Sequence, residues 1–365
     1  MPLAALALGG GVFAVAAWLG NVIAYGTTAS TARSYGAGAR SEAVAEGVQA
    51  SWLAMAVGVL VLLTAQLAAG PVFRILGGAH PDVTGPAIGW LRVAAFGAPG
   101  LMLATAGNGW MRGVQDTRRP LRYVVGANLL SALLCPVLVY PVGLGLTGSA
   151  VANVVAQTVA GLLFVRALLA ERVSLRPRPL VLRRQVAAGQ DLLVRVAAIQ
   201  ACFVSAAAVA ARFGVAALAA HQIALQLWMF CTLALDSVGI AAQALVGAAL
   251  GARRPDLARR VATRCVVIGL AAGVLLGVVF AMDGVLIGAG DLGYLRNLTI
   301  VSALVGFLPA VWLTLPAAAG LGGIWAALTL FIVLRLVGML LRLRTGRWAT
   351  VGGGDREPAW QAGHP

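Results

Sequence analysis

The sequence predicts an all-α membrane protein that crosses the bilayer many times. Hydrophobic residues make up 60% of the 365 positions and charged residues only 11%, with a mean hydropathy of +0.91. Water-soluble domains carry about 25% charged residues, so this chain has too few charges to cover a surface that faces water. A soluble cytosolic enzyme is therefore excluded, and the long apolar runs are expected to be membrane-spanning helices.

Ten apolar runs are long enough to cross a membrane, and they are apolar around the whole helix. Many contain Gly, Ala and Pro, which favour close helix packing in lipid. The expected spans are Pro2 to Gly26, Val44 to Ala69, Thr84 to Trp110, Leu121 to Val142, Ser149 to Leu169, Val186 to Ala211, Val215 to Leu250, Thr263 to Gly290, Leu295 to Leu315 and Leu321 to Leu341.

The charge pattern orients these spans. The net charge is +15, and all 27 basic residues are arginine. The arginines gather in the loops after the odd-numbered spans, whereas the even-numbered loops hold few charges. By the positive-inside rule the odd-numbered loops are cytoplasmic, so the N-terminus is expected outside. The arginines therefore mark membrane orientation rather than a nucleic-acid partner.

An internal repeat relates the two halves of the chain. The loop Gly36 to Arg40 matches the loop Ala249 to Arg253 at an offset of 213 residues. A second set of positions, such as Gly109 with Gly284, matches at an offset of 175 residues. Two structural repeats of this kind are common in secondary transporters.

The two offsets differ by 38 residues, so the second half is shorter than the first by that length. The shortfall lies within Thr263 to Gly290, where one apolar run stands in for two spans. The run Val186 to Ala211 has its counterpart before residue 1, so a helix is expected upstream. The parental plan is six plus six helices, reduced to about ten. Ten spans also place Arg342, Arg344 and Arg347 outside, against the positive-inside rule.

Four motifs stand out in the two halves: Gly113 to Pro120, Ala219 to Ile223, Leu235 and Asp236 followed by Ala241 to Gly247, and Asp283 to Asp291. Together they resemble motifs of the multidrug and toxic compound extrusion (MATE) transporters, in particular their DinF-like branch. The resemblance implies two six-helix lobes around a central cavity, alternating access, and export of organic compounds in exchange for H+ or Na+. In that family the first helix commonly supplies an aspartate for cation coupling, and no residue of this chain can be assigned to that role.

Two aspartates inside apolar runs are the candidates for cation coupling, because a charge within the hydrocarbon is costly and usually functional. Asp236 lies far from the Arg-rich end of its run, where a carboxyl group could exchange a proton; alternatively, it locks the bundle. Asp283 corresponds to Asn108 at the offset of 175 residues. That polar pair could bind substrate or cation, or could form bonds within each lobe.

Five polar residues are candidates for lining the substrate cavity: Asn108, Asn128, Asn153, Gln157 and His221. The amides could equally bond adjacent helices, and His221 could be a bonded or interface histidine.

Other polar and aromatic residues have structural expectations. Asp191 and Arg195 are four residues apart and are expected to form an ion pair. Asp116 and Asp291 follow equivalent helix ends, where capping or loop bonding is expected. The tryptophans inside the runs could stack on cationic organic substrates or pack the bundle; they are Trp18, Trp110, Trp228, Trp312 and Trp325.

The expected organisation is an N-terminal lobe at residues 1–172, a cytoplasmic linker at 173–185, a C-terminal lobe at 186–348 and a disordered tail at 349–365. The four cysteines stand singly without metal-ligand spacing. Walker, HExxH and GxSxG motifs are missing, so neither an ATP-driven pump nor a common hydrolase is predicted.

The predicted function is secondary active export of organic or cationic drugs or metabolites by H+ or Na+ antiport. No cofactor beyond the coupling ion is expected. We expect a monomer in the inner (plasma) membrane, whose partners are small organic substrates and the bilayer. The alternatives are a lipid-linked oligosaccharide flippase of the same superfamily and a truncated remnant that does not transport. Because two helices of the plan are missing, the chain as written is expected to transport poorly.

Overall fold

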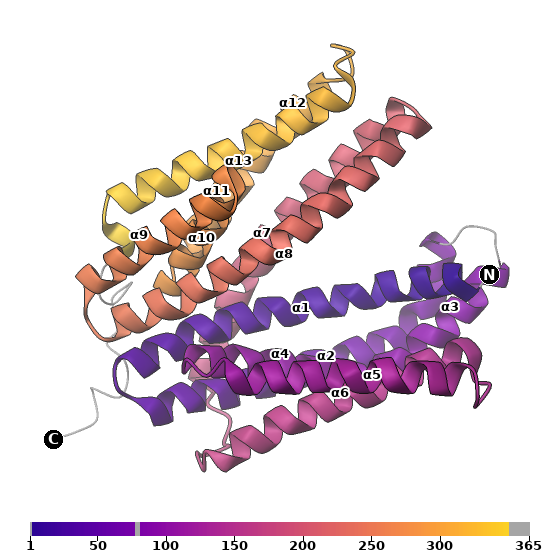
Figure 1. Cartoon of the computed structure of the whole chain (residues 1–365), viewed down its shortest axis with the longest axis horizontal. Helices are drawn as coiled ribbons and strands as arrows, with labels where there is room; N and C mark the ends of the chain where they lie inside the picture. The colour runs from indigo at the N-terminus through magenta and orange to yellow at the C-terminus, as the bar shows by residue number, and fades with distance from the viewer. Residues whose placement is uncertain (1, 77–80, 350–365) are drawn as a thin grey trace. The chain divides into compact units, whose positions relative to one another are not determined.

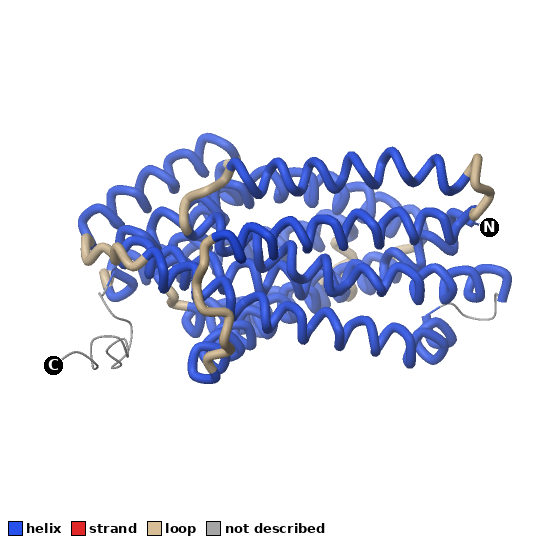
Figure 2. Tube along the Cα trace, turned by 90° about the horizontal axis from the view of Figure 1, so that it is seen from below, coloured by secondary structure: helices blue, strands red, loops and turns tan. Residues whose placement is uncertain are grey.

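A computed structural model of the chain describes residues 2–76 and 81–349. Within these ranges it consists of helices joined by short loops, without a strand (Figure 1, Figure 2). The elements are α1 (Pro2–Gly36), α2 (Arg40–Leu76), α3 (Pro81–Ala94), η1 (Ala95–Gly97), α4 (Ala98–Gly113), α5 (Arg118–Val139), α6 (Gly145–Ala170), α7 (Pro179–Arg212), α8 (Val215–Gly251), α9 (Pro255–Ala272), α10 (Val274–Ala289), α11 (Leu292–Val301), η2 (Ser302–Phe307), α12 (Leu308–Leu313), α13 (Gly320–Arg344) and η3 (Arg347–Ala349).

Nine helical stretches of the described ranges are long and apolar enough to cross a membrane, and Leu276–Ala289 is a shorter apolar helix. The predicted all-α polytopic fold is therefore confirmed. The predicted count of ten full spans is not, because one expected span is replaced by two short helices.

The helices form two compact units. The first comprises Met1–Thr31 and Ala39–Val186, and the second comprises Ala32–Gly38 and Ala187–Pro365. The boundary at Val186 lies beside the predicted linker, whose residues 173–178 have no helix. The last residues of α1 group with the second unit, which the sequence did not predict. Apart from Ala349, the predicted tail lies outside the described residues.

Glycines allow the helices of the first unit to pack closely. A Cβ atom on Gly58 of α2 would lie 2.6 Å from the Cα of Pro99 on α4. A Cβ on Gly100 of α4 would lie 2.5 Å from the carbonyl oxygen of Gln157 on α6. Such approaches exclude any side chain, as expected where small residues bring helices together in lipid.

The α8–α10 pair of the second unit is built in the same way. A Cβ on Gly284 of α10 would lie 2.0 Å from the carbonyl oxygen of Gly239 on α8, and one on Gly288 would lie 2.5 Å from that of Gln243. The two glycines are four residues apart and so share one helix face. This small-residue face lets α10 lie directly against the inner part of α8.

The expected single span Thr263 to Gly290 is wrong: the chain folds there into a hairpin of α9 and α10. The turn is Gly273, whose backbone is extended with φ −178°. A Cβ on Gly277 of α10 would lie 1.9 Å from the carbonyl oxygen of Gly269 on α9, so the two helices touch directly beside the turn. An apolar run of this length has the composition of one span, but the glycines at 269, 273 and 277 allow a hairpin.

The repeat explains where the 38 residues are lost. At the offsets of 213 and 175 residues, the end of α9 corresponds to Val59 in α2, and the start of α10 corresponds to Pro99 in α4. In the first unit these two helices already touch at Gly58 and Pro99. In the second unit Gly273 alone joins α9 to α10 at this point. The second unit therefore has no counterpart of the outer half of α2 or of the short helix α3.

The hairpin also corrects the predicted position of the C-terminal arginines. Because α9 enters the membrane and α10 returns to the side from which α9 started, the hairpin adds no membrane crossing. The end of α13 therefore lies on the same side of the membrane as the start of α9. Arg259 of α9 and Trp348 after α13 line the same small recess. Arg342, Arg344 and Arg347 therefore lie at the Arg-rich end of the second unit, in agreement with the positive-inside rule.

The two Gly-Ala-Arg loops also lie at that end. A Cβ on Gly36 would lie 1.9 Å from the carbonyl oxygen of Ala248, and one on Gly251 would lie 1.9 Å from that of Arg33. Arg33 in turn donates two hydrogen bonds, at 3.1 and 3.2 Å, to the carbonyl oxygen of Gly288 near the C-terminus of α10. The prediction that the two loops share one side is confirmed.

Candidate functional site

Asp283 on α10 is the centre of a buried ion network in the second unit. Its carboxylate accepts hydrogen bonds from Arg335 on α13, at 2.7 and 2.8 Å, and from Arg195 on α7, at 2.5 Å. All three side chains are 8–11% exposed. Because two guanidinium groups hold this carboxylate, a metal cation would have to displace one of them. The contacts favour bonding within the unit at Asp283, and cation coupling by this residue stays a prediction.

The sequence analysis missed both basic partners of Asp283. Arg335 lies in the middle of the last apolar run, and a charge at that depth is itself a functional signal. Asp191 pairs with Arg296 on α11 and Arg195 pairs with Asp283 on α10, and the pair of Asp191 with Arg195 stays a prediction. Asp191 and Arg195 each pair with a side chain on another helix, because helix packing brings opposite charges together in a low-dielectric interior.

Asp236 lies midway along α8, at the level where the α9–α10 hairpin ends. A Cβ on Gly273, at the turn, would lie 3.5 Å from the side chain of Leu235. The Oδ1 atom of Asp236 lies 4.0 Å from the position of a Cβ on Gly239, which faces Phe280 of α10. The Asp236 side chain is half-buried. Asp236 therefore lies at the boundary between the part of α8 that α10 covers and the part of α8 that extends beyond the hairpin.

The candidate cavity residues of the first unit lie on three helices. Asn108 is half-buried on α4, and Asn128 is exposed on α5, where its amide donates to a backbone carbonyl of its own helix at 2.8 Å. Asn153 and Gln157 are half-buried on α6, and Gln157 lies at the crossing with α4. Among the described residues no hydrogen bond joins any two of these side chains, and their role in a cavity stays a prediction.

The repeat accounts for the exposure of Asn128. At the offset of 175 residues, Asn128 and Asn153 correspond to Ala303 and Leu328, which are buried in a core that includes α7. The described part of the first unit contains no counterpart of α7. The face of α5 that would receive such a helix is largely uncovered, and Leu133 on this helix is 69% exposed.

His221 lies in the outer half of α8 and is fully buried. Its ring centroid is 5.9 Å from that of Trp325 on α13, and Trp325 lies 6.1 Å from Trp228 of α8. The structure thus groups His221 with two of the predicted tryptophans rather than with the amides of the first unit.

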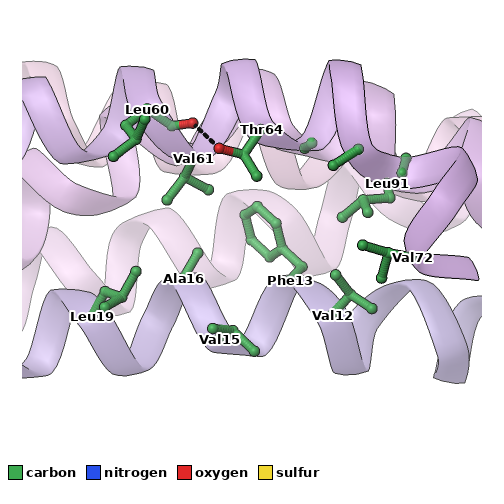
Figure 3. A pocket seen from close by; sticks show the side chains of 13 residues that line it. Val12, Phe13, Val15, Ala16, Leu19, Leu60, Val61, Thr64, Val72 and Leu91 are labelled. Atoms are coloured by element: carbon green, nitrogen blue, oxygen red, sulfur yellow. Dashed lines mark hydrogen bonds between the residues drawn. The ribbon is translucent and has the colours of Figure 1, made fainter. Parts of the chain in front are cut away.

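An apolar cavity of about 300 Å³ lies between α1 and α2 in the first unit (Figure 3). Its walls are aliphatic and aromatic, with Phe13 projecting between the two helices. Thr64 contributes the polar atom of the lining, and its hydroxyl donates to the carbonyl oxygen of Leu60 at 2.7 Å. None of the predicted site residues lines this cavity.

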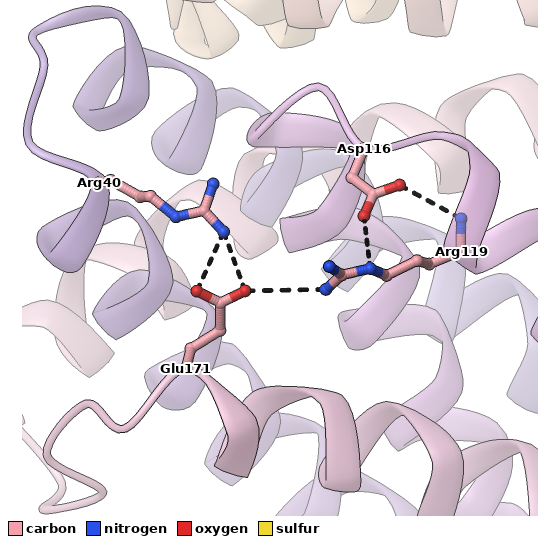
Figure 4. A network of polar contacts seen from close by, with 4 residues as sticks. All are labelled: Arg40, Asp116, Arg119 and Glu171. Carbon is pink, nitrogen blue, oxygen red and sulfur yellow. Dashed lines mark hydrogen bonds and ion pairs between the residues drawn. The ribbon is translucent and has the colours of Figure 1, made fainter.

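Four charged side chains join the Arg-rich ends of α2, α5 and α6 (Figure 4). Arg40 donates to both oxygens of Glu171, at 2.9 and 3.0 Å, and Arg119 lies 3.8 Å from the same carboxylate. Asp116 accepts a hydrogen bond from the backbone N–H of Arg119 at 3.2 Å and pairs with its guanidinium at 3.2 Å. The prediction that Asp116 caps or bonds a helix end is confirmed.

Asp291, the counterpart of Asp116, also pairs with an arginine in the second unit. Its carboxylate pairs with Arg342 of α13 at 2.6 Å. The same guanidinium lies 4.8 Å from the ring centre of Tyr294, whose hydroxyl donates to the carbonyl oxygen of Gly338 at 2.6 Å. These contacts bind the ends of α11 and α13 together, so this aspartate also has the predicted structural role.

Comparison with known proteins identifies the family. The MatE family model matches residues 1–137 and 192–322. Protein DETOXIFICATION 44, chloroplastic, of Arabidopsis thaliana is 30% identical over an alignment that covers 75% of this chain and 60% of that protein. DNA damage-inducible protein F of Escherichia coli (strain K12) is 29% identical, with 85% of this chain and 77% of that protein covered. The chain thus spans about 60% of the length of the plant relatives.

Solved structures of similar fold agree. A crystal structure of MATE in the bent conformation superposes with a TM-score of 0.85 at 21% identity, covering 95% of this chain and 87% of the other. A MOP superfamily transporter from Pyrococcus furiosus has a TM-score of 0.85 at 22% identity, with coverages of 95% and 89%. The family match extends over both halves of the repeat and over the motifs that carry the resemblance. The chain therefore belongs to the MatE family of multi-pass membrane transporters.

Proposed function

We propose that this chain is a secondary active exporter of organic compounds, coupled to inward movement of H+ or Na+ and acting as a monomer in the inner (plasma) membrane. Membership of the transporter family supports the class of activity. A neighbour of similar fold is described as a multidrug resistance MATE family transporter, which supports structurally varied substrates. No cofactor beyond the coupling ion is required by the mechanism.

The observation that carries the proposal is the position of Asp236. Asp236 is a half-buried carboxylate midway along a spanning helix, at the tip of a hairpin of two short helices, and an ionisable group at such a depth is a candidate for function. Asp283 is already held by two arginines. Asp236 is therefore the better candidate to take up and release the coupling cation.

Ethidium accumulation in a bacterial host that lacks its own efflux pumps tests this proposal. Cells that express the chain are expected to hold less dye than vector controls. Asp236→Asn should abolish the difference, because an amide cannot exchange a proton or balance a cation. Asp256→Asn, at the loop end of α9, is the matched control and should export normally.

Each variant is checked for folding by size-exclusion chromatography of a fluorescent fusion. If the well-folded chain never differs from vector, the remnant alternative is correct and the proposal is wrong. If Asp236→Asn exports as well as the parent chain, cation coupling does not depend on Asp236.

A further inference from the structure

His221 presents an unexplained polar group inside the second unit. Its side chain is 0% exposed, and neither Nδ1 nor Nε2 has a hydrogen-bond partner among the described residues. A buried polar atom without a partner is costly, so such groups are rare in folded proteins and call for an explanation.

The surroundings of His221 are aromatic. His221, Trp228 and Leu235 recur every seven residues and so lie along one stripe of α8. Trp325 of α13 lies across from this stripe, with ring centroids 5.9 Å from His221 and 6.1 Å from Trp228. Both indoles are half-buried, so parts of their surfaces are accessible.

The shortened hairpin covers only the Leu235 end of this stripe, and Trp325 of α13 packs against the rest. The turn at Gly273 reaches only as far as Leu235, and the stripe continues beyond it to Trp228 and His221. In the first unit the corresponding space is filled by α3 and the outer half of α2. There the counterpart of Trp325 is Ala150, fully buried in a core with Trp90 of α3. Aromatic rings of the second unit thus stand where the first unit has a helix.

The charge around the stripe decides what kind of ligand it suits. No acidic residue occurs in the sequence from 192 to 235 or from 297 to 334, which includes the outer halves of α7, α8 and α13. Arg212 is basic and lies 4.7 Å from the ring centre of Trp312. The acidic residue that follows this range on α8 is Asp236, eight residues beyond Trp228, so the aromatic end of the stripe itself carries no carboxylate, and an uncharged ring with one hydroxyl matches it.

We propose that His221, Trp228 and Trp325 form a binding site for an uncharged aromatic molecule that carries a hydroxyl group. The hydroxyl donates to the unprotonated nitrogen of the imidazole, and the ring packs against the two indoles. The site rests on the proposed function only in that its ligand is a transported substrate. Binding itself needs no ion gradient.

Scintillation-proximity binding of tritiated 2-naphthol to the purified chain in detergent tests the site, with naphthalene as the ring without a hydroxyl. The parent chain is expected to bind 2-naphthol about tenfold more tightly than naphthalene, as one buried hydrogen bond allows. His221→Leu should remove this preference and leave naphthalene binding unchanged. Trp325→Leu should weaken both ligands. Trp18→Leu, at a 40% exposed tryptophan of α1, should weaken neither.

Equal affinities of the parent chain for 2-naphthol and naphthalene would overturn the proposal, even if His221→Leu failed to fold. A folded His221→Leu variant that keeps the preference would also overturn it, and so would an effect of Trp18→Leu equal to that of Trp325→Leu. If the chain binds 2-naphthol as expected but exports nothing, the binding site stands and only the transport function fails.

Discussion

At the scale of single residues, the main feature of the second unit is the buried ion network around Asp283. Asp283 balances Arg335 and Arg195 from two other helices, and each guanidinium would otherwise be a buried cation. The Nε atom of Arg335 is buried without a hydrogen-bond partner among the described residues, which adds to the cost of burying this side chain. Asp283 is therefore more important for the stability of the unit than either arginine.

Asp283→Asn is expected to lower the free energy of unfolding by about 3–5 kcal/mol, because it leaves two buried cations without their carboxylate. Arg335→Met should cost less, since Asp283 keeps Arg195. Thermal unfolding of the purified variants in detergent measures both. The matched control is Asp116→Asn in a partly exposed pair, which should cost less than about 1 kcal/mol. Equal losses for Asp283→Asn and Asp116→Asn would show that the network is not stabilising.

At the scale of elements, the α9–α10 hairpin is the main departure from the predicted fold. A run of apolar residues indicates burial in lipid, but it does not distinguish one long helix from two short ones. The distinction depends on Gly269, Gly273 and Gly277, which let the chain reverse and let the two helices touch. Their spacing of four residues was visible in the sequence and is the signal that could have revealed the hairpin.

Gly277→Ala is expected to destabilise the second unit by about 1–3 kcal/mol, because its methyl group would overlap the backbone of α9. Gly322→Ala in α13 is the control, since nothing lies within 4 Å of its Cβ position. This control should be neutral or more stable by up to about 1 kcal/mol through helix propensity. Thermal unfolding of the two variants measures this difference in stability, and equal unfolding midpoints would contradict the observed packing of the hairpin.

At the scale of the whole molecule, the hairpin sets the topology. A full tenth span would leave the chain end on the opposite side from the Arg253 loop, whereas two half-crossing helices return it to the same side. From the sequence alone the C-terminal arginines are placed outside, against the positive-inside rule, and this conflict is attributed to a lost span. The second unit resolves that conflict without adding a span.

Cysteine labelling in intact cells checks this topology. In a background without the four native cysteines, Arg254→Cys and Thr345→Cys are expected to resist a membrane-impermeant maleimide until the cells are permeabilised. Val142→Cys, in the loop between α5 and α6, should react in intact cells and serves as the control for the opposite side. Labelling of Thr345→Cys before permeabilisation would show that α9 and α10 add a full crossing.

Much of this protein could be predicted from sequence alone: the helical membrane fold, the repeat, the length lost from the second half, and the family. These features follow from the composition of the chain, the spacing of its motifs and the distribution of its charges, all of which can be read along the sequence. The partners of Asp283 and Asp191, the reversal at Gly273 and the grouping of His221 with two tryptophans depended on the tertiary structure. The ion pairs and the contact of His221 with Trp325 join helices far apart in sequence, and the reversal at Gly273 depends on α9 and α10 packing against each other. The packing of the helices therefore decides which side chains meet.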